Sequence, residues 1–274
     1  MDYKIWLHAC LFCQKNFMRV FKNIVLLFVL QVFLFSSCKE EKKESPTPNN
    51  LPKNTSILFV NGLSDASGNI QFKLGNEVLA DVAASSYSKY IKVSEGDQKL
   101  TIAAGGSNTF FDLKIEKDKY YTVLLSGTAS APKIEVLNDD LSNVSDPLSK
   151  FSYRFANLFN VGNDSLSMQA YYPSYKLWGT QAGVHEYVAY GKSSAPTEYT
   201  ANAAAQWRAI KSGSEDTKEY NVSGIIYRLG AQTIYYEAPQ TFSGNLNKHY
   251  TIVVFGQDSN ASSAIIEHEL QILP

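Results

Sequence analysis

Several short patterns in the chain contain residue types that could do chemistry. Ser86-Tyr87-Ser88-Lys89 has the SxxK spacing of a serine nucleophile, Glu267-His268-Glu269 alternates carboxylates with an imidazole, and Asp65–Asn69 places side-chain oxygens at alternate positions. An SxxK nucleophile also needs SDN and KTG elements, which the sequence lacks. In a strand, Glu267 and Glu269 point away from His268. The Asp65–Asn69 segment lacks the bidentate glutamate of a calcium loop. We therefore expect no catalytic residue, no metal and no cofactor.

Cys38 is the residue with the clearest chemical role. It follows the apolar run Ile24–Phe35 and the pair Ser36-Ser37, and the charged run Lys39–Glu44 comes directly after it. The apolar run is too short to cross a bilayer, which takes about 20 residues. It fits the hydrophobic region of a secretory signal behind the positive Arg19 and Lys22. This order resembles a bacterial lipoprotein signal, which implies that Cys38 is lipidated and becomes the mature N-terminus. The alternative is a plain secreted protein that is cleaved near Ser37.

The N-terminal region is accordingly divided into a signal peptide over residues 1–37 and a lipidated Cys38 with a flexible tether to residue 54. Met18 is an alternative start. Prolines in the tether favour an extended backbone. Cys10 and Cys13 leave with the signal, so their CxxC spacing predicts neither a redox nor a metal site, and the mature chain has no disulfide.

The resemblance to lipoproteins also implies a location. A diacylglyceryl group with a further acyl chain, such as palmitate, anchors a lipoprotein stably in the outer membrane. Lys39-Glu40-Glu41 resembles the basic-then-acidic export tag of Bacteroidetes-type lipoproteins, which implies exposure to the cell exterior. The alternative interpretation of these residues is a solvated tether, with the protein on the periplasmic face.

The charge balance excludes one class of partner. The chain has 25 Lys and Arg against 26 Asp and Glu, and residues 1–37 contain only the basic Lys4, Lys15, Arg19 and Lys22 and the acidic Asp2. The remainder therefore has 21 basic and 25 acidic residues. A mildly acidic chain without a basic stripe is not expected to bind nucleic acid. Its 45% hydrophobic content is typical of a folded protein rather than a disordered one.

From Ser56 onward the chain has the pattern of β-strands. Ile70, Phe72 and Leu74 alternate with polar residues, and Gly75-Asn76 offers a tight turn to a returning strand. Similar short strands and turns continue without helical periodicity. This pattern predicts an immunoglobulin-like antiparallel β-sandwich over residues 55–138.

The pattern then recurs. Ser56–Asn61 is similar to Ser152–Asn157, 96 positions later, and Lys119–Gly127 is similar to Lys248–Gly256, 129 positions later. The difference predicts about 33 inserted residues in the second copy. We therefore expect an all-β protein with two tandem β-sandwich domains, the second over residues 150–274 with an insertion.

Three segments of the first copy carry a family resemblance: Leu58–Ala66, Ile70–Asn76 and Tyr120–Gly127. Together they resemble the domain-of-unknown-function 4397 family, which occurs in secreted and lipid-anchored bacterial proteins. The resemblance implies a fold and a location but no activity. The family's histidine is replaced by Asn61 here, so no property that depends on that histidine is carried over.

An aromatic segment in the second copy supplies the candidate binding residues. Tyr171, Tyr172, Tyr175 and Trp178 surround a proline, and exposed rings of these types suit stacking on sugars or anchoring a protein partner. The alternative is that they fill the gap between sandwich and insertion, and Trp207 and Tyr235-Tyr236 allow the same two interpretations.

The functional prediction is a lipid-anchored, non-catalytic binding or structural module that captures a polysaccharide or other polymer at the cell surface. One alternative is an accessory subunit that binds an envelope protein. The other is a glycoside-active enzyme, which would need two facing carboxylates.

Overall fold

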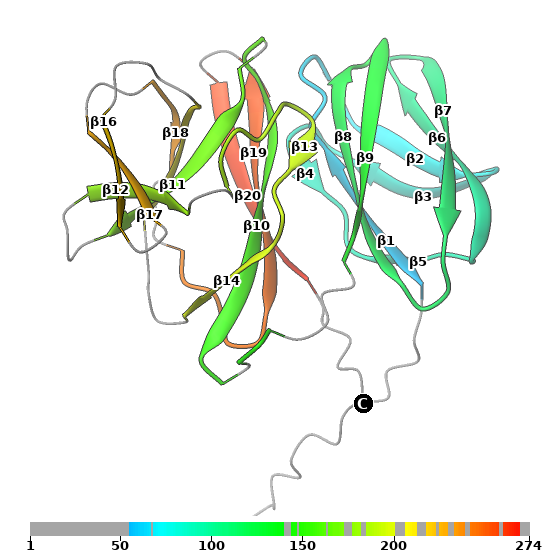
Figure 1. Ribbon diagram of the computed structural model, residues 1–274. Coiled ribbons are helices and arrows are strands. Elements are labelled where there is room, and N and C mark those ends of the chain that lie inside the picture. The colour runs from blue at the N-terminus through cyan, green and yellow to red at the C-terminus, as the bar shows by residue number, and fades with distance from the viewer. Residues whose placement is uncertain are drawn as a thin grey trace, which may run out of the picture. The chain divides into compact units, whose positions relative to one another are not determined.

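The computed structural model describes residues 55–66, 68–139, 144–146, 148–162, 164–172, 177–181, 185–200, 206–212, 218–222, 225–229, 233–238, 242–257 and 260–268. The chain divides into two units, residues 1–49 and residues 50–274, and all of the described residues belong to the second. The described residues form twenty strands and no helix, which confirms the predicted all-β class (Figure 1). The predicted signal peptide, Cys38, Lys39-Glu40-Glu41 and the tether lie outside the described residues.

The first part of the unit is a sandwich of two sheets. One sheet has the order β4-β1-β8-β9, with β5 also paired to β1, and the other has the order β3-β2-β6-β7. Their bounds are β1 Ser56–Asn61, β2 Ile70–Leu74, β3 Glu77–Val82, β4 Ser86–Tyr87, β5 Ile91–Lys92, β6 Gly96–Ala104, β7 Ser107–Ile115, β8 Tyr120–Thr128 and β9 Ala131–Asn138.

The second part repeats this arrangement with additions. One sheet has the order β13-β10-β19-β20, with β14 also paired to β10, and the other has the order β16-β17-β12-β11-β15-β18. Their bounds are β10 Lys150–Asn160, β11 Leu166–Tyr172, β12 Leu177–Gln181, β13 Lys192–Ser193, β14 Thr197–Thr200, β15 Trp207–Lys211, β16 Lys218–Val222, β17 Ile225–Leu229, β18 Ile234–Glu237, β19 His249–Gln257 and β20 Asn260–His268. The structure thus contains the two tandem sandwiches that the repeat predicts.

The strand pairing differs from the sequence prediction in one respect. The sheets are antiparallel except for the pairs β1–β8 and β10–β19, which run parallel. Both pairs have the same register, since Ser56 lies opposite Tyr120 and Ser152 lies opposite His249. The two offsets, 152 − 56 = 96 and 249 − 120 = 129, are those of the sequence repeat. A parallel pair needs a long crossover connection, and the strands between β1 and β8 supply it.

Hydrogen bonds inside the sandwiches repeat as well. The Asn61 side chain donates to the Val82 carbonyl at 3.0 Å and accepts from the Leu63 amide at 3.2 Å. Asn157 does the same with Val188 and Phe159, at 2.8 and 3.0 Å. Each asparagine thus links the residue two positions further along the chain to a backbone carbonyl distant in sequence. The inserted hairpin β16–β17 pairs along β12 and extends the second sheet.

Each sandwich has a core between its two sheets. In the first, Phe59 from one sheet stacks on Phe72 from the other, with ring centroids 4.4 Å apart, and both side chains are fully buried. In the second, Phe155, Met168 and Ile252 belong to the corresponding cluster. Burying side chains of this size stabilises a fold by about 1.5–3 kcal/mol each.

A third apolar cluster lies between the two sandwiches. Leu58, Val60 and Leu124 of β1 and β8 pack against residues of β10, β19 and β20, namely Ala156, Leu158, Val253, Phe255 and Ile266. The β1–β8 and β10–β19 sheets are therefore buried on both faces. We call this contact the inter-sandwich interface.

Candidate functional site

The aromatic segment lies on the six-stranded sheet, where Tyr171 of β11 is directly opposite Trp178 of β12. Their ring centroids are 5.4 Å apart. Met168 on β11 and Trp207 on the neighbouring strand β15 both face the core. Tyr171 is three positions after Met168 on the same strand, so by strand alternation it faces away from the core. Both rings are partly exposed. They form an aromatic pair on the outward face of the sheet.

Two polar side chains complete this site. The Arg208 guanidinium lies 4.4 Å from the centroid of the Trp178 ring, and its Nε donates to Gln169 Oε1 at 2.9 Å. A cation over an indole is attracted by about 0.5–2 kcal/mol, depending on its desolvation. Gln169 is fully buried, and its Nε2 has no hydrogen-bond partner among the described residues. We call Gln169, Tyr171, Trp178 and Arg208 the aromatic cluster.

The electrostatics of the aromatic cluster follow from Arg208. Burial lowers the pKa of its guanidinium, and Glu237, which lies opposite it on β18, raises that pKa. The site thus combines two flat, partly exposed rings with a positive charge whose Nε donates to the buried Gln169 amide oxygen. Such a combination suits a ligand with one apolar face and several hydrogen-bonding oxygens.

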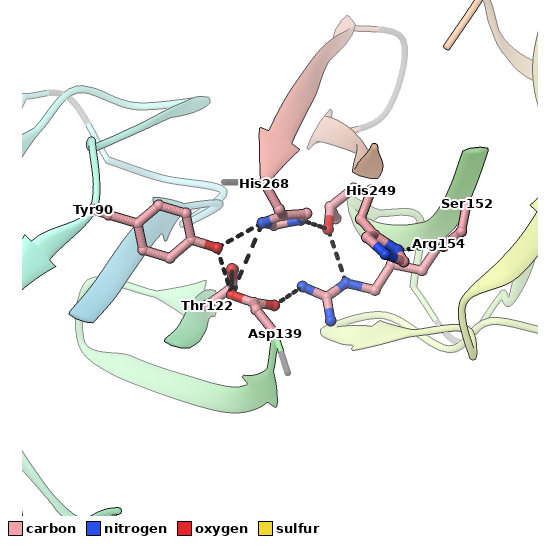
Figure 2. Close-up of polar contacts among 8 residues, drawn as sticks. Tyr90, Thr122, Asp139, Ser152, Arg154, His249 and His268 are labelled. Atoms are coloured by element: carbon pink, nitrogen blue, oxygen red, sulfur yellow. Dashed lines mark hydrogen bonds and ion pairs between the residues drawn. The ribbon is translucent and has the colours of Figure 1, made fainter. Parts of the chain in front are cut away.

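A second group of polar residues lies at the inter-sandwich interface (Figure 2). Asp139, directly after β9, forms an ion pair with Arg154 of β10, and the two side chains are 1% and 5% exposed. The Arg154 Nε also donates to Thr251 Oγ1 at 2.8 Å. Thr122 Oγ1 and the Tyr90 hydroxyl both donate to Asp139 Oδ2, at 2.6 and 2.8 Å. The buried charges are thus paired and hydrogen-bonded, as burial requires.

His268 joins the same network, and His249 makes a separate contact beside it. His268 of β20 lies between the Tyr90 hydroxyl, 2.7 Å from its Nδ1, and Thr251 Oγ1, 2.6 Å from its Nε2. His249 contacts Ser152 Oγ at 2.8 Å through its Nδ1 (Figure 2). Burial lowers the pKa of His268 to about 4, although Asp139 raises it, so the imidazole is neutral at pH 7. Burial and the nearby Asp139 raise the pKa of Tyr90 well above its usual value.

The arrangement of this network points to cohesion rather than catalysis. Asp139, Arg154 and His268 are all buried, so a substrate could reach them only if the sandwiches separated. The sequence prediction placed His268 on the side of its strand opposite Glu267. His249 lies on the face of β19 opposite the core residue Tyr250, and it is also buried. Glu267 is exposed and pairs with Lys248 at 2.9 Å, away from His268.

The remaining predicted residues are placed as follows. Tyr175 and the side chain of Tyr172 lie outside the described residues, so only Tyr171 and Trp178 of the predicted set are described together. Trp207 is 2% exposed and belongs to the core, with Tyr236 5.3 Å away. Arg208 and Gln169 were not predicted, although their positions beside the aromatic strands follow from β pairing.

The fold and the polar residues of the inter-sandwich interface define the class of the protein: it is an all-β protein of two duplicated sandwiches that pack against each other. Residues 55–160 match the model of the domain of unknown function DUF4397. This stretch runs from β1 through β10, so the family resemblance of the first copy is supported. The comparison with curated proteins gave no match. No helix long and apolar enough to cross a membrane is found in the described part of the chain.

Proposed function

We propose that the protein is a lipid-anchored, non-catalytic binding module of the bacterial envelope that captures a polysaccharide through the aromatic cluster. The observation that carries this proposal is the partly exposed Tyr171–Trp178 pair beside Arg208 and Gln169. Aromatic rings offer large contact areas at a small cost in side-chain entropy, and the guanidinium can donate to hydroxyl or carboxylate oxygens. Cys38 would hold the module at the membrane, and the tether would let it reach polymers near the surface.

The direct test is binding by the compact unit Asn50–Pro274. Affinity electrophoresis against a panel of neutral and acidic polysaccharides should retard the unit in at least one gel. Replacing Tyr171 and Trp178 together by Ala should abolish the retardation without changing the melting temperature by more than a few degrees. Phe110→Ala is a matched control, since Phe110 is 57% exposed and lies on the first sandwich.

The outcomes separate the two interpretations of the aromatic segment. Loss of binding with an unchanged melting temperature identifies a ligand site. A large drop in the melting temperature identifies the rings as packing residues and removes the basis of the proposal. Absence of retardation across the whole panel also counts against it.

A second candidate function is an accessory subunit that binds an envelope protein. It is favoured by Val78 and Phe110, which are 50% and 57% exposed on the outward face of the β3-β2-β6-β7 sheet. The two residues belong to one row of paired positions across the sheet, because Val78 pairs with Lys73, Lys73 with Thr101, and Thr101 with Phe110. Mild crosslinking in cells followed by purification should then recover one stoichiometric protein, and Phe110→Ala should reduce its yield.

A further inference from the structure

The duplication relates the two sides of the inter-sandwich interface residue by residue. With the offset of 129, Thr122 corresponds to Thr251 and Asp139 corresponds to His268, because Tyr121 pairs with Asn138 as Tyr250 pairs with Glu267. The two pairs make equivalent contacts within their own copies: Thr122 bonds to Asp139, and Thr251 bonds to His268, each at 2.6 Å.

Equivalent residues also meet across the interface. His268 Nδ1 lies 3.9 Å from Asp139 Oδ2, and Val60 belongs to the same apolar cluster as its equivalent Ala156, as Leu124 does with Val253. The same face of each copy is therefore buried against the other. This is the arrangement of an isologous dimer, here built within one chain.

The copies differ in charge at two positions of this face. With the offset of 96, Leu58 of the first copy corresponds to Arg154 of the second, and Asp139 of the first corresponds to His268 of the second. Arg154 forms its ion pair with Asp139, across the interface. Two first copies would instead bring two Asp139 carboxylates together without a cation, and two second copies would bring together Arg154 and His268 without an anion. An unpaired buried charge is strongly unfavourable, so only unlike copies suit each other.

We infer that the outward face of the β1–β8 sheet is an interaction surface for a copy of its own fold, and that Asp139 and Arg154 select the second sandwich as its partner. The apolar cluster supplies most of the contact, and the ion pair supplies the discrimination. The pairing therefore prevents self-association of first sandwiches on neighbouring molecules.

Charge reversal in the unit Asn50–Pro274 tests this inference. The variants are Asp139→Lys, Arg154→Glu and the double variant, and the control is Lys248→Glu, which reverses one charge of the exposed Lys248–Glu267 pair. Calorimetry gives the number and temperature of the unfolding transitions, and sedimentation velocity gives the oligomeric state. The wild type should be a monomer with one transition.

Each single reversal should lower the melting temperature by on the order of 10 °C or split the transition in two, because it leaves like charges buried together. Exposure of the apolar face should also produce dimers. The double variant should regain at least half of the decrease in melting temperature and should be a monomer. If the single variants are insoluble, a soluble double variant would support the inference equally. A double variant no better than the single ones overturns it, as does a single reversal no more harmful than Lys248→Glu.

Discussion

Gly62, the residue that follows β1, packs closely against Leu158 of the second sandwich. A Cβ added there would lie 2.6 Å from Leu158 Cδ1 and 2.9 Å from the Leu125 carbonyl oxygen. Gly62→Ala is therefore expected to lower the free energy of unfolding by about 1–3 kcal/mol, as overpacking typically does. Urea denaturation measures the change. Gly68→Ala is the matched control, because a Cβ at Gly68 meets nothing within 4 Å. Equal effects of the two substitutions would contradict the close approach.

Two buried histidines predict how stability depends on pH. Burial lowers the pKa of His185 to about 3 and that of His268 to about 4, from an ordinary value of 6.5. Between these values the unfolded chain binds protons that the folded chain does not, so stability falls as the pH drops below about 6.5. The slope approaches about 1.4 kcal/mol per pH unit for each histidine.

Between pH 6.5 and about 4.5 the two histidines lower the stability as the pH falls, whereas Glu135, whose pKa is raised by burial, acts in the opposite direction. Asp164, Glu198 and Glu267 have lowered pKa values, so their stabilising contributions fade only at more acidic pH. Chemical denaturation at several pH values gives the free energy of unfolding as a function of pH. We expect this free energy to fall more steeply with decreasing pH in the wild type than in His185→Gln. Because Glu135 is present in both proteins, equal slopes for the wild type and His185→Gln would show that His185 is protonated in the folded state.

At the scale of the strand, the buried asparagines test the duplication. Asn61 and Asn157 each satisfy one backbone amide and one backbone carbonyl, and both are fully buried. Replacing either by Ala leaves these groups without partners, so each substitution should cost about 1–3 kcal/mol. Urea denaturation of both variants should give similar losses. Asn160→Ala is the control, since within the described part of the chain the Asn160 side chain accepts an exposed 3.3 Å hydrogen bond from the Gly162 amide.

The strands also show which parts of the fold the sequence could predict. Ile70–Leu74 alternates because it has one buried face, and the structure places Ile70 and Phe72 in the core. By contrast, Ser56–Asn61 and His249–Phe255 are buried on both faces, and their sequences are nearly continuous apolar runs. Such runs are typical of strands covered on both sides. The inter-sandwich interface was therefore visible in composition, but the partner of each face was not, because contacts between distant residues leave no periodic signal.

The aromatic cluster was predictable only in part for a related reason. Tyr171 and Trp178 stand out because aromatic residues are dense in that segment. Arg208 is far from them in sequence, and it joins them only because β15 pairs with β11 on the side opposite β12. Strand order within a sheet is set by the whole fold, so the cation and the amide of this site could not be assigned beforehand.

At the scale of the whole molecule, the proposed lipid anchor predicts where the chain is found in cells. Cys38→Ala removes the thiol that would carry the lipid, and one or more acyl chains are what would retain the protein at a membrane. We expect the variant in the soluble fraction, or as an unprocessed precursor, while the wild type sediments with membranes. Immunoblotting of fractionated cells measures this. A variant that remains entirely in the membrane pellet would show that Cys38 is not the anchor.

The proposed export tag predicts which side of the membrane the sandwiches face. Replacing Lys39, Glu40 and Glu41 by Ala leaves Cys38 intact, so the variant should remain membrane-bound and change only its exposure. Protease added to intact cells should digest the wild type and spare the triple variant, and Lys42→Ala with Lys43→Ala is a control for altered tether charge. Digestion of both proteins would make the tag dispensable for export. Protection of both would place the aromatic cluster in the periplasm, where its ligand would have to be a periplasmic polymer or an envelope protein.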